Sequence, residues 1–238
     1  MSETKKLPIT RIIFIGPPGS GKGTYSSRLS PTLGIPHISI GNIFREEVKK
    51  GTPLGKAVAR YMGRGDLVPD ETAIDVLRER LSQLDAKRGF ILDGYPRTIR
   101  QAEELEKITK VDVVILLNIP KDILLEKLTA RRVCNNCGAI YNIADIHKTI
   151  NGVQYDLPPM SPKKKDVCDV CGGKLVQRKD DALQVIQDRM DVYGKQTEPL
   201  VEFYRKRGLI EEVYVSEGVD EMTPKILEQL KRLELRHR

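Results

Sequence analysis

The sequence contains no tryptophan, and aromatic residues make up only 5% of its 238 residues. Proteins that bind single-stranded nucleic acid stack bases on aromatic side chains, so this composition gives such a surface little support. No apolar run approaches the roughly 20 residues that a helix needs to cross a bilayer. The segment 1–8 (MSETKKLP) also lacks the apolar core of a secretory signal. We therefore expect a cytoplasmic protein that acts on neither a membrane nor nucleic acid.

Cysteine is also scarce, with four residues that fall into two pairs. Cys134 and Cys137 form one C-x-x-C pair, and Cys168 and Cys171 form the other. This spacing, without a secretory signal, favours a metal site over disulfides or idle thiols. Four thiolates with a glycine after each pair are typical of a closed structural Zn²⁺ site.

The formal net charge is +7, and part of the excess lies in Lys163–Lys165 and in the tail 231–238. A basic protein can bind nucleic acid, a membrane surface or small anionic ligands. We expect these two lysine- and arginine-rich runs to be solvated surface.

Continuous apolar runs alternate with helical patterns along most of the chain. We expect strands at 9–16, 89–93, 111–118 and 209–215, and helices at 22–33, 120–132 and 224–235. This rhythm predicts a parallel sheet covered by helices on both faces. The segments 41–70, which is helical without a strand, and 134–179, which is rich in Gly, Pro and Cys, interrupt it as insertions.

The segment 16–24 (GPPGSGKGT) stands where the first strand turns into a helix, which is the context of a phosphate-binding loop. Its glycines let backbone N–H groups point at phosphate oxygens, and the following helix N-terminus adds partial positive charge. Lys22 can reach the β- and γ-phosphates. The general motif has a hydroxyl residue directly after the lysine, whereas here Gly23 intervenes and the hydroxyl belongs to Thr24.

Three further segments, 37–45 (HISIGNIFR), 65–71 (GDLVPDE) and 89–102 (GFILDGYPRTIRQA), complete a specific pattern. Together with the phosphate loop, they resemble adenylate kinases in order and spacing over nearly the whole chain. The resemblance implies an α/β P-loop fold of three layers with a parallel central sheet. Its core would comprise 1–38, 69–129 and 182–238, with a small helical NMP-binding insertion at 39–68 and a zinc-binding lid at 130–181. The implied activity is Mg²⁺-dependent transfer of the terminal phosphoryl group of ATP to AMP, giving two ADP, by a monomer.

The resemblance also assigns residues to sites. The implied ATP site comprises Gly19, Ser20, Gly21, Lys22, Gly23, Thr24, Lys127, Arg131, Ile140, Tyr141 and Val219. The implied AMP site comprises Ile40, Arg45, Asp66, Leu67, Val68, Gly94, Tyr95, Pro96, Arg97, Gln101, Arg178 and Arg189. The implied catalytic residues are Lys22, Asp93, Arg97, Arg131, Arg178 and Arg189.

These residue types suit phosphoryl transfer, in which positioning and electrostatics do most of the work. The planar forks of Arg45 and Arg97 suit a monophosphate, and Asp93 could hold the hydration shell of Mg²⁺. Gln101 can both donate to and accept from an adenine edge. Eleven residues separate Arg178 from Arg189, so a continuous helix would place both on one face.

The chain departs from the family pattern at several positions. Ile40 and Asn42 stand where the family usually has Thr and Asp, although Asn42 can still cap a helix. Lys127 stands where an arginine would stack on the donor base. Thirty residues separate Cys137 from Cys168, longer than usual for zinc-lidded members, and the excess falls within 142–165.

Two kinds of alternative function remain open. A GTP-dependent AMP kinase and a uridylate/cytidylate kinase are the nearest enzymes, although the long lid argues against the latter. A zinc-ribbon nucleic-acid-binding protein would explain the net charge and the cysteines. It would leave the phosphate loop and the DGYPR motif at 93–97 without a role.

Overall fold

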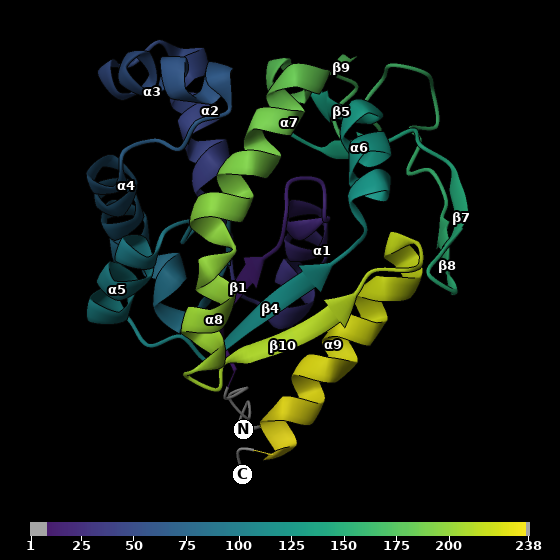
Figure 1. Cartoon of the computed structure of the whole chain (residues 1–238). Helices are drawn as coiled ribbons and strands as arrows, with labels where there is room; N and C mark the ends of the chain where they lie inside the picture. Colours follow the sequence, from purple (N-terminus) through teal and green to yellow (C-terminus); the bar gives the residue numbers. More distant parts are fainter. Residues whose placement is uncertain (1–8, 237–238) are drawn as a thin grey trace, which may run out of the picture.

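The computed structural model describes residues 9–236 and centres on a five-stranded parallel sheet (Figure 1). Its strand order is β10-β4-β1-β3-β2, with bounds β1 Arg11–Ile15, β2 His37–Ser39, β3 Phe90–Asp93, β4 Val113–Asn118 and β10 Ile210–Tyr214. Each neighbouring pair is parallel. The predicted parallel sheet is confirmed. Residues 1–8 of the predicted core and the last two residues of the basic tail lie outside the described range.

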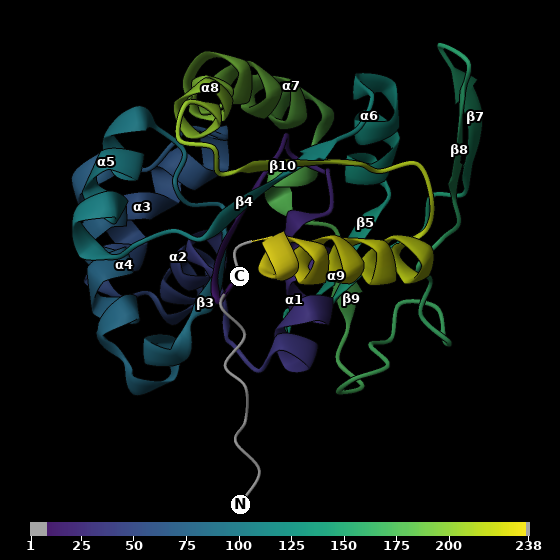
Figure 2. The same ribbon diagram turned by 90° about the horizontal axis from the view of Figure 1, so that it is seen from below.

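Helices cover both faces of this sheet. Successive residues of each strand point to opposite faces, so each strand contributes apolar side chains to two hydrophobic clusters. Ile13, Leu92 and Val114 pack on one face, with α4 (Asp70–Ser82), α5 (Ile99–Ile108) and α8 (Pro199–Arg205). Ile12, Ile91 and Val113 pack on the other face, with α1 (Lys22–Leu33), α6 (Lys121–Thr129) and α9 (Val219–Arg236). Figure 2 shows α1 and α9 side by side beneath the sheet. The predicted three-layer α/β fold is confirmed.

Two helices, α2 (Ile40–Lys50) and α3 (Pro53–Arg64), stand between β2 and α4 within the predicted NMP-binding insertion. The side chain of Thr52 caps α3 by accepting a hydrogen bond from the Gly55 N–H at 3.0 Å. The sequence prediction missed β2. Its three residues, HIS, contain no apolar run. It lies at the edge of the sheet and pairs with β3 alone, so only the tertiary structure defines it.

The predicted lid segment contains a small antiparallel sheet and a separate hairpin. The sheet has the order β6-β5-β9, with bounds β5 Arg131–Cys134, β6 Ile140–Asn142 and β9 Leu175–Val176. The hairpin consists of β7 (Ile146–Ile150) and β8 (Val153–Leu157). The prediction of a helix running to residue 132 was wrong: α6 ends at Thr129, because the chain then pairs with β6 and β9.

The helical segment after the lid also differs from expectation. A short 3-10 turn, η2 (Lys179–Asp181), is followed by Ala182 in an extended conformation before α7 (Leu183–Val192) begins. Arg178 and Arg189 therefore do not share one continuous helix. A π-helical turn, η3 (Tyr193–Thr197), then joins α7 to α8 as one long rod across the front of Figure 1.

Smaller differences concern element ends. The 3-10 helix η1 (Leu84–Arg88) precedes β3, and α9 begins at Val219, so Pro224 stands inside the helix rather than at its start. Among residues 9–236, no helix is long and apolar enough to cross a membrane.

Candidate active site

The phosphate loop connects the end of β1 to the start of α1, at the carboxyl edge of the sheet. Gly19 and Gly21 adopt φ values of 85° and 98°, a left-handed conformation that favours glycine. The Lys22 ammonium folds back over the loop and donates hydrogen bonds to the carbonyls of Gly16 at 2.7 Å and Pro17 at 2.9 Å. Burial, together with the nearby arginines, lowers the pKa of Lys22 to about 7. Bound phosphate would raise this pKa again by favouring the ammonium.

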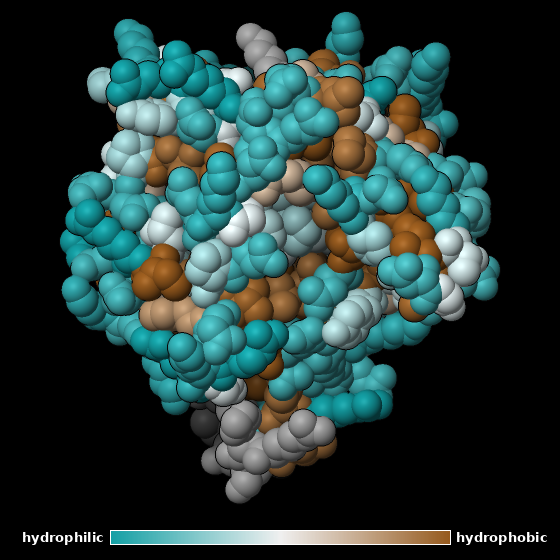
Figure 3. All heavy atoms as spheres, in the orientation of Figure 1, coloured by the Kyte–Doolittle hydropathy of each residue, from teal (hydrophilic) through white to brown (hydrophobic). Residues whose placement is uncertain are grey.

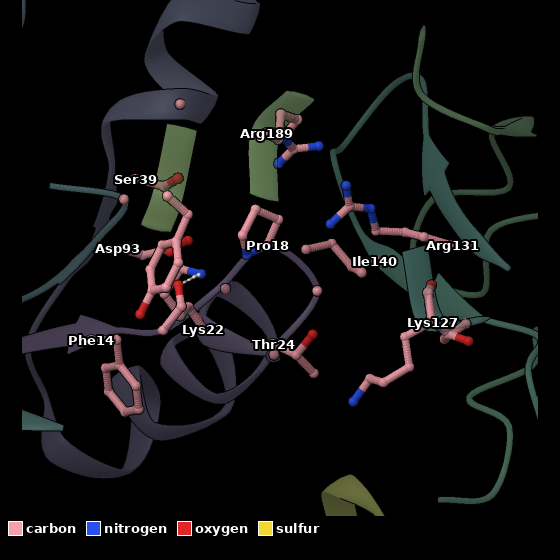
Figure 4. Close-up of a pocket in the computed structure, with 18 of the residues that line it drawn as sticks. Phe14, Pro18, Lys22, Thr24, Ser39, Asp93, Lys127, Arg131, Ile140 and Arg189 are labelled. Atoms are coloured by element: carbon pink, nitrogen blue, oxygen red, sulfur yellow. Dashed lines mark hydrogen bonds between the residues drawn. The ribbon is translucent and has the colours of Figure 1, made fainter. Parts of the chain in front are cut away.

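Five arginines from separate elements line the cavity above this loop: Arg45, Arg97, Arg131, Arg178 and Arg189. Figure 4 shows the Arg131 and Arg189 guanidinium groups approaching from opposite sides. In the space-filling view, this largely hydrophilic face is hollowed near its centre, where Figure 1 places the phosphate loop (Figure 3). Burial lowers the pKa of Arg178 to about 9, and its Nε is buried without a hydrogen-bond partner in the described structure. An anion in the cavity would relieve these desolvation costs.

Two aspartates from η2 partly neutralise these cations, and neither was predicted. Asp181 accepts hydrogen bonds from Arg131 Nε at 2.8 Å and from Arg131 Nη2. Asp180 pairs with Arg189 at 3.0 Å. The sequence offered one signal for these two aspartates, which was their position two and three residues after Arg178.

Asp93 lies at the end of β3, directly beside the phosphate loop. A Cβ on Gly23 would stand 3.0 Å from an Asp93 carboxylate oxygen, which explains why glycine follows Lys22 here. Burial alone would raise the pKa of Asp93, but His37, 3.5 Å away, and the charges of Lys22 and Arg97 lower it to about 2. A carboxylate that stays ionised beside the phosphates is a suitable outer ligand for hydrated Mg²⁺.

A second cavity adjoins the first and shares Arg45, Arg97 and Arg189 with it. Of the predicted AMP-site residues, this cavity brings together Ile40, Arg45, Asp66, Leu67, Val68, Gly94, Tyr95, Arg97, Gln101 and Arg189. The two others, Pro96 and Arg178, line the first cavity.

Hydrogen bonds within this second cavity hold Gln101 and Arg45 in place. The Gln101 side chain is buried: its Nε2 donates to Asp70 Oδ1 at 2.7 Å, and its Oε1 accepts from the Arg97 N–H at 2.8 Å. Asn42, which could have capped a helix, does not do so. Ser39 occupies the N-cap position, and Asn42 lies inside α2, where its Oδ1 accepts a hydrogen bond from Arg45 at 2.5 Å.

The predicted donor residues Lys127, Ile140 and Val219 also line the first cavity. Of the predicted phosphate-loop residues, the same cavity is lined by Gly19, Gly21, Lys22, Gly23 and Thr24, whereas Ser20 is fully buried. Burial lowers the pKa of Lys127 to about 8. Figure 4 shows the Lys127 ammonium pointing into the cavity. The sequence missed Ile146, Leu157, Pro158, Met160, Glu217 and Gly218 in the lining of this cavity.

Tyr141 departs from its predicted place. Neighbouring residues of a strand face opposite sides, so Ile140 faces the cavity while Tyr141 turns toward the cysteines. Its hydroxyl donates to Cys168 Sγ at 3.6 Å and accepts from the Asp169 N–H at 2.8 Å. The Tyr141 side chain therefore packs on the cysteine cluster and is not among the residues that line the cavity.

The four cysteines converge, with all Sγ atoms within 4.8 Å of one another. The Cys134–Cys171 and Cys137–Cys168 sulfur atoms lie 3.4 and 3.6 Å apart. Tetrahedral zinc with Zn–S bonds of about 2.3 Å places its sulfur ligands about 3.8 Å apart. The donor set and its spacing therefore fit a structural zinc ion.

Comparisons with known proteins agree with this geometry. The sequence model of the family described as "Adenylate kinase" matches residues 14–209. The adenylate kinase of Geobacillus sp. (strain WCH70) is 46% identical over 224 residues, which is 92% of this chain and 97% of the relative. That of Moorella thermoacetica is 47% identical over 214 residues, 88% of this chain and 92% of the relative. That of Clostridium tetani is 46% identical over 204 residues, 84% and 88% of the two chains. The chain belongs to the adenylate kinase family.

Proposed function

We propose that this chain catalyses the reversible, Mg²⁺-dependent transfer of the terminal phosphoryl group of ATP to AMP, giving two ADP. The observation that carries the proposal is the junction of the two cavities. The phosphate loop lines the first cavity and Gln101 lines the second. Arg45, Arg97 and Arg189 line both. A donor phosphate chain and an acceptor monophosphate can therefore meet among fixed positive charges.

The residue roles follow from position. Lys22 and the phosphate-loop backbone hold the donor phosphates, while Arg45 and Arg97 hold the acceptor monophosphate. Arg131, Arg178 and Arg189 surround the space between them, where negative charge spreads over the transferred oxygens. The acceptor oxygen is already deprotonated, so the reaction needs neither a protein nucleophile nor a base.

Two ions complete the proposed enzyme. Mg²⁺, when bound with the nucleotide beside Asp93, supplies charge neutralisation at the phosphates. Zn²⁺ at Cys134, Cys137, Cys168 and Cys171 is structural, because four cysteines leave no open coordination position. A four-thiolate metal site needs reduced cysteines, which favours a reducing compartment, and we therefore assign the chain to the cytoplasm. We also propose that it is a monomer, as the family resemblance implies.

We propose that the NMP-binding arm (39–68) and the lid (130–181) move relative to the core during the reaction. Lys49 of the NMP-binding arm donates a 2.8 Å hydrogen bond to the Asn135 carbonyl of the lid, so the two arms touch over the site. We assign this arrangement to the closed state. Closure excludes water, which would otherwise accept the phosphoryl group.

Isotope transfer tests this function directly. With ATP labelled at the γ-phosphate, Mg²⁺ and AMP, we expect the label to appear in ADP and to require both nucleotides. The Lys22→Met variant should transfer label slower by orders of magnitude, whereas Lys56→Met, at an exposed position on α3, should match the wild type. Label released only as inorganic phosphate would contradict the proposal, and efficient transfer from GTP alone would reassign the donor.

A further inference from the structure

The β7–β8 hairpin belongs by sequence to the lid segment, yet it is docked on the core. Ile146 and Leu157, which pair at the root of the hairpin, are 1% and 5% exposed. They pack in the same hydrophobic cluster as Val215 and Met222. Figures 1 and 2 both show the hairpin at the edge of the molecule on the side of α6, apart from the β6-β5-β9 sheet.

Polar contacts fix this docking on two sides. The Asp156 N–H donates a 2.8 Å hydrogen bond to the Ser216 carbonyl, which adds a short parallel bridge to the segment that precedes α9. Lys148 of β7 forms an ion pair with Glu126 of α6. The hairpin thus spans from α6 to the loop before α9.

The root of the hairpin faces the nucleotide cavity. Ile146, Leu157 and Pro158 line it together with Gly218 and Val219. Pro158 and Gly218 approach so closely that a Cβ on Gly218 would stand 3.1 Å from the proline ring. Figure 1 shows the hairpin and the start of α9 on the side of α6, and α2, which carries Arg45, on the other side of the molecule. These residues therefore line the end of the cavity that lies on the side of α6.

The orientation of the donor places its base at this end. The terminal phosphate must point toward Arg45 and Arg97, where the acceptor monophosphate lies, so the nucleoside must extend the opposite way. An apolar wall at that end matches the flat face of a base, which gains from burial against aliphatic side chains.

We propose that the root of the β7–β8 hairpin, Ile146, Leu157 and Pro158, is a wall of the donor base site and sets the affinity for the donor nucleoside. This inference rests on the proposed function. It gives the excess length within 142–165 a role in binding the donor, separate from the metal site.

Binding experiments can separate the base from the phosphates. Leu157→Ala should weaken ATP binding about tenfold, because the base loses an apolar contact. Binding of inorganic tripolyphosphate, which has the phosphates but no base, should change less than twofold. Leu157→Met, which conserves the apolar volume, should restore ATP binding. Calorimetric titration of each ligand gives these affinities directly.

A shortened hairpin provides the matched control. Removing Thr149, Ile150, Val153 and Gln154 takes two residues from each strand, so the cross-strand register and the Asn151-Gly152 turn are kept. This variant keeps Ile146, Leu157 and the Lys148–Glu126 pair, and it should bind ATP like the wild type.

The outcomes distinguish the two proposals. Equal losses of ATP and tripolyphosphate affinity in Leu157→Ala would show a general structural role and overturn the base-wall proposal. Unchanged ATP affinity in that variant would overturn it as well. Failure of the wild-type protein to transfer phosphate to AMP would contradict the proposed function, while a base-specific loss of ATP affinity would still support the wall.

Discussion

Arg131 of β5 and Asp181 of η2, 50 residues apart in the sequence, form a two-point ion pair at the wall of the nucleotide cavity. The Asp181 side chain is fully buried, and that of Arg131 is 14% exposed. This aspartate compensates the positive charge of an arginine that lines the phosphate-binding cavity. The pair therefore couples the stability of the closed arrangement to the charge of the ligand.

Replacing Asp181 by Asn should destabilise the nucleotide-free protein by about 3 kcal/mol, because Arg131 loses its buried partner. Saturating ATP supplies negative charge at the same place, so the loss should be smaller in the complex. Thermal unfolding with and without ATP measures both values. Asp85→Asn, which breaks the half-exposed pair with Arg80, is the control and should change Tm little in either state. An equal loss of Tm with and without ATP would contradict the coupling.

Lys22 should take up a proton when ATP binds. Burial in the closed arrangement lowers its pKa to about 7, so at pH 8 it is mostly neutral there, and bound phosphates raise that pKa toward the ordinary value. Uptake should approach one proton at pH 8 and vanish at pH 6, where Lys22 is already charged. ATP affinity should accordingly fall as pH rises through 7.

Calorimetry in two buffers of different ionisation heat counts these protons. The Lys22→Met variant should take up none from this position, and the Lys127→Met variant serves as the control for the second lysine, whose pKa is about 8. If Lys22→Met retained the full uptake at pH 8, the assignment to Lys22 would be wrong.

The cysteine cluster should contribute stability without contributing chemistry. Purified protein should contain about one zinc per chain, as a closed four-thiolate site implies. Replacing Cys134 and Cys168 by Ser should remove the metal and lower Tm, since a small lid cannot build its own core. Activity well below Tm should largely persist, because the arginines are not metal ligands. Two disulfides found by mass spectrometry in metal-free protein, or lost turnover with a folded lid, would each count against this role.

Much of the fold could be predicted because four of the five sheet strands coincide with continuous apolar runs, as in Val113–Asn118. The strand β2 could not, because its three residues are defined only by pairing with β3. Similarly, Arg131 was predicted to lie in the last turn of a helix. Only its pairing with Asn142 in β6 makes it part of a strand.

The phosphate loop could be predicted because its residues are contiguous and their spacing has a direct physical meaning. The contacts of Gln101 with Asp70 could not, since 31 residues separate them and only the tertiary fold brings them together. The direction of Tyr141 depends on knowing that β6 is a strand. Ile146 and Leu157 reach the cavity only because the hairpin docks on the core, and no local pattern indicates that docking.

The measurement that tests the central claim most directly is a steady-state comparison of acceptors with Mg²⁺-ATP as donor. AMP, GMP, CMP and UMP should be compared by kcat/KM in a coupled assay of ADP formation. We predict the highest kcat/KM for AMP, because the chain belongs to the adenylate kinase family and one cavity is lined both by Gln101, Val68 and Ile40 and by Arg45 and Arg97. Arg97→Met should lose activity with every acceptor, whereas the exposed Lys56→Met should lose none. A higher kcat/KM for CMP or UMP, or equal rates with and without any acceptor, would contradict the account.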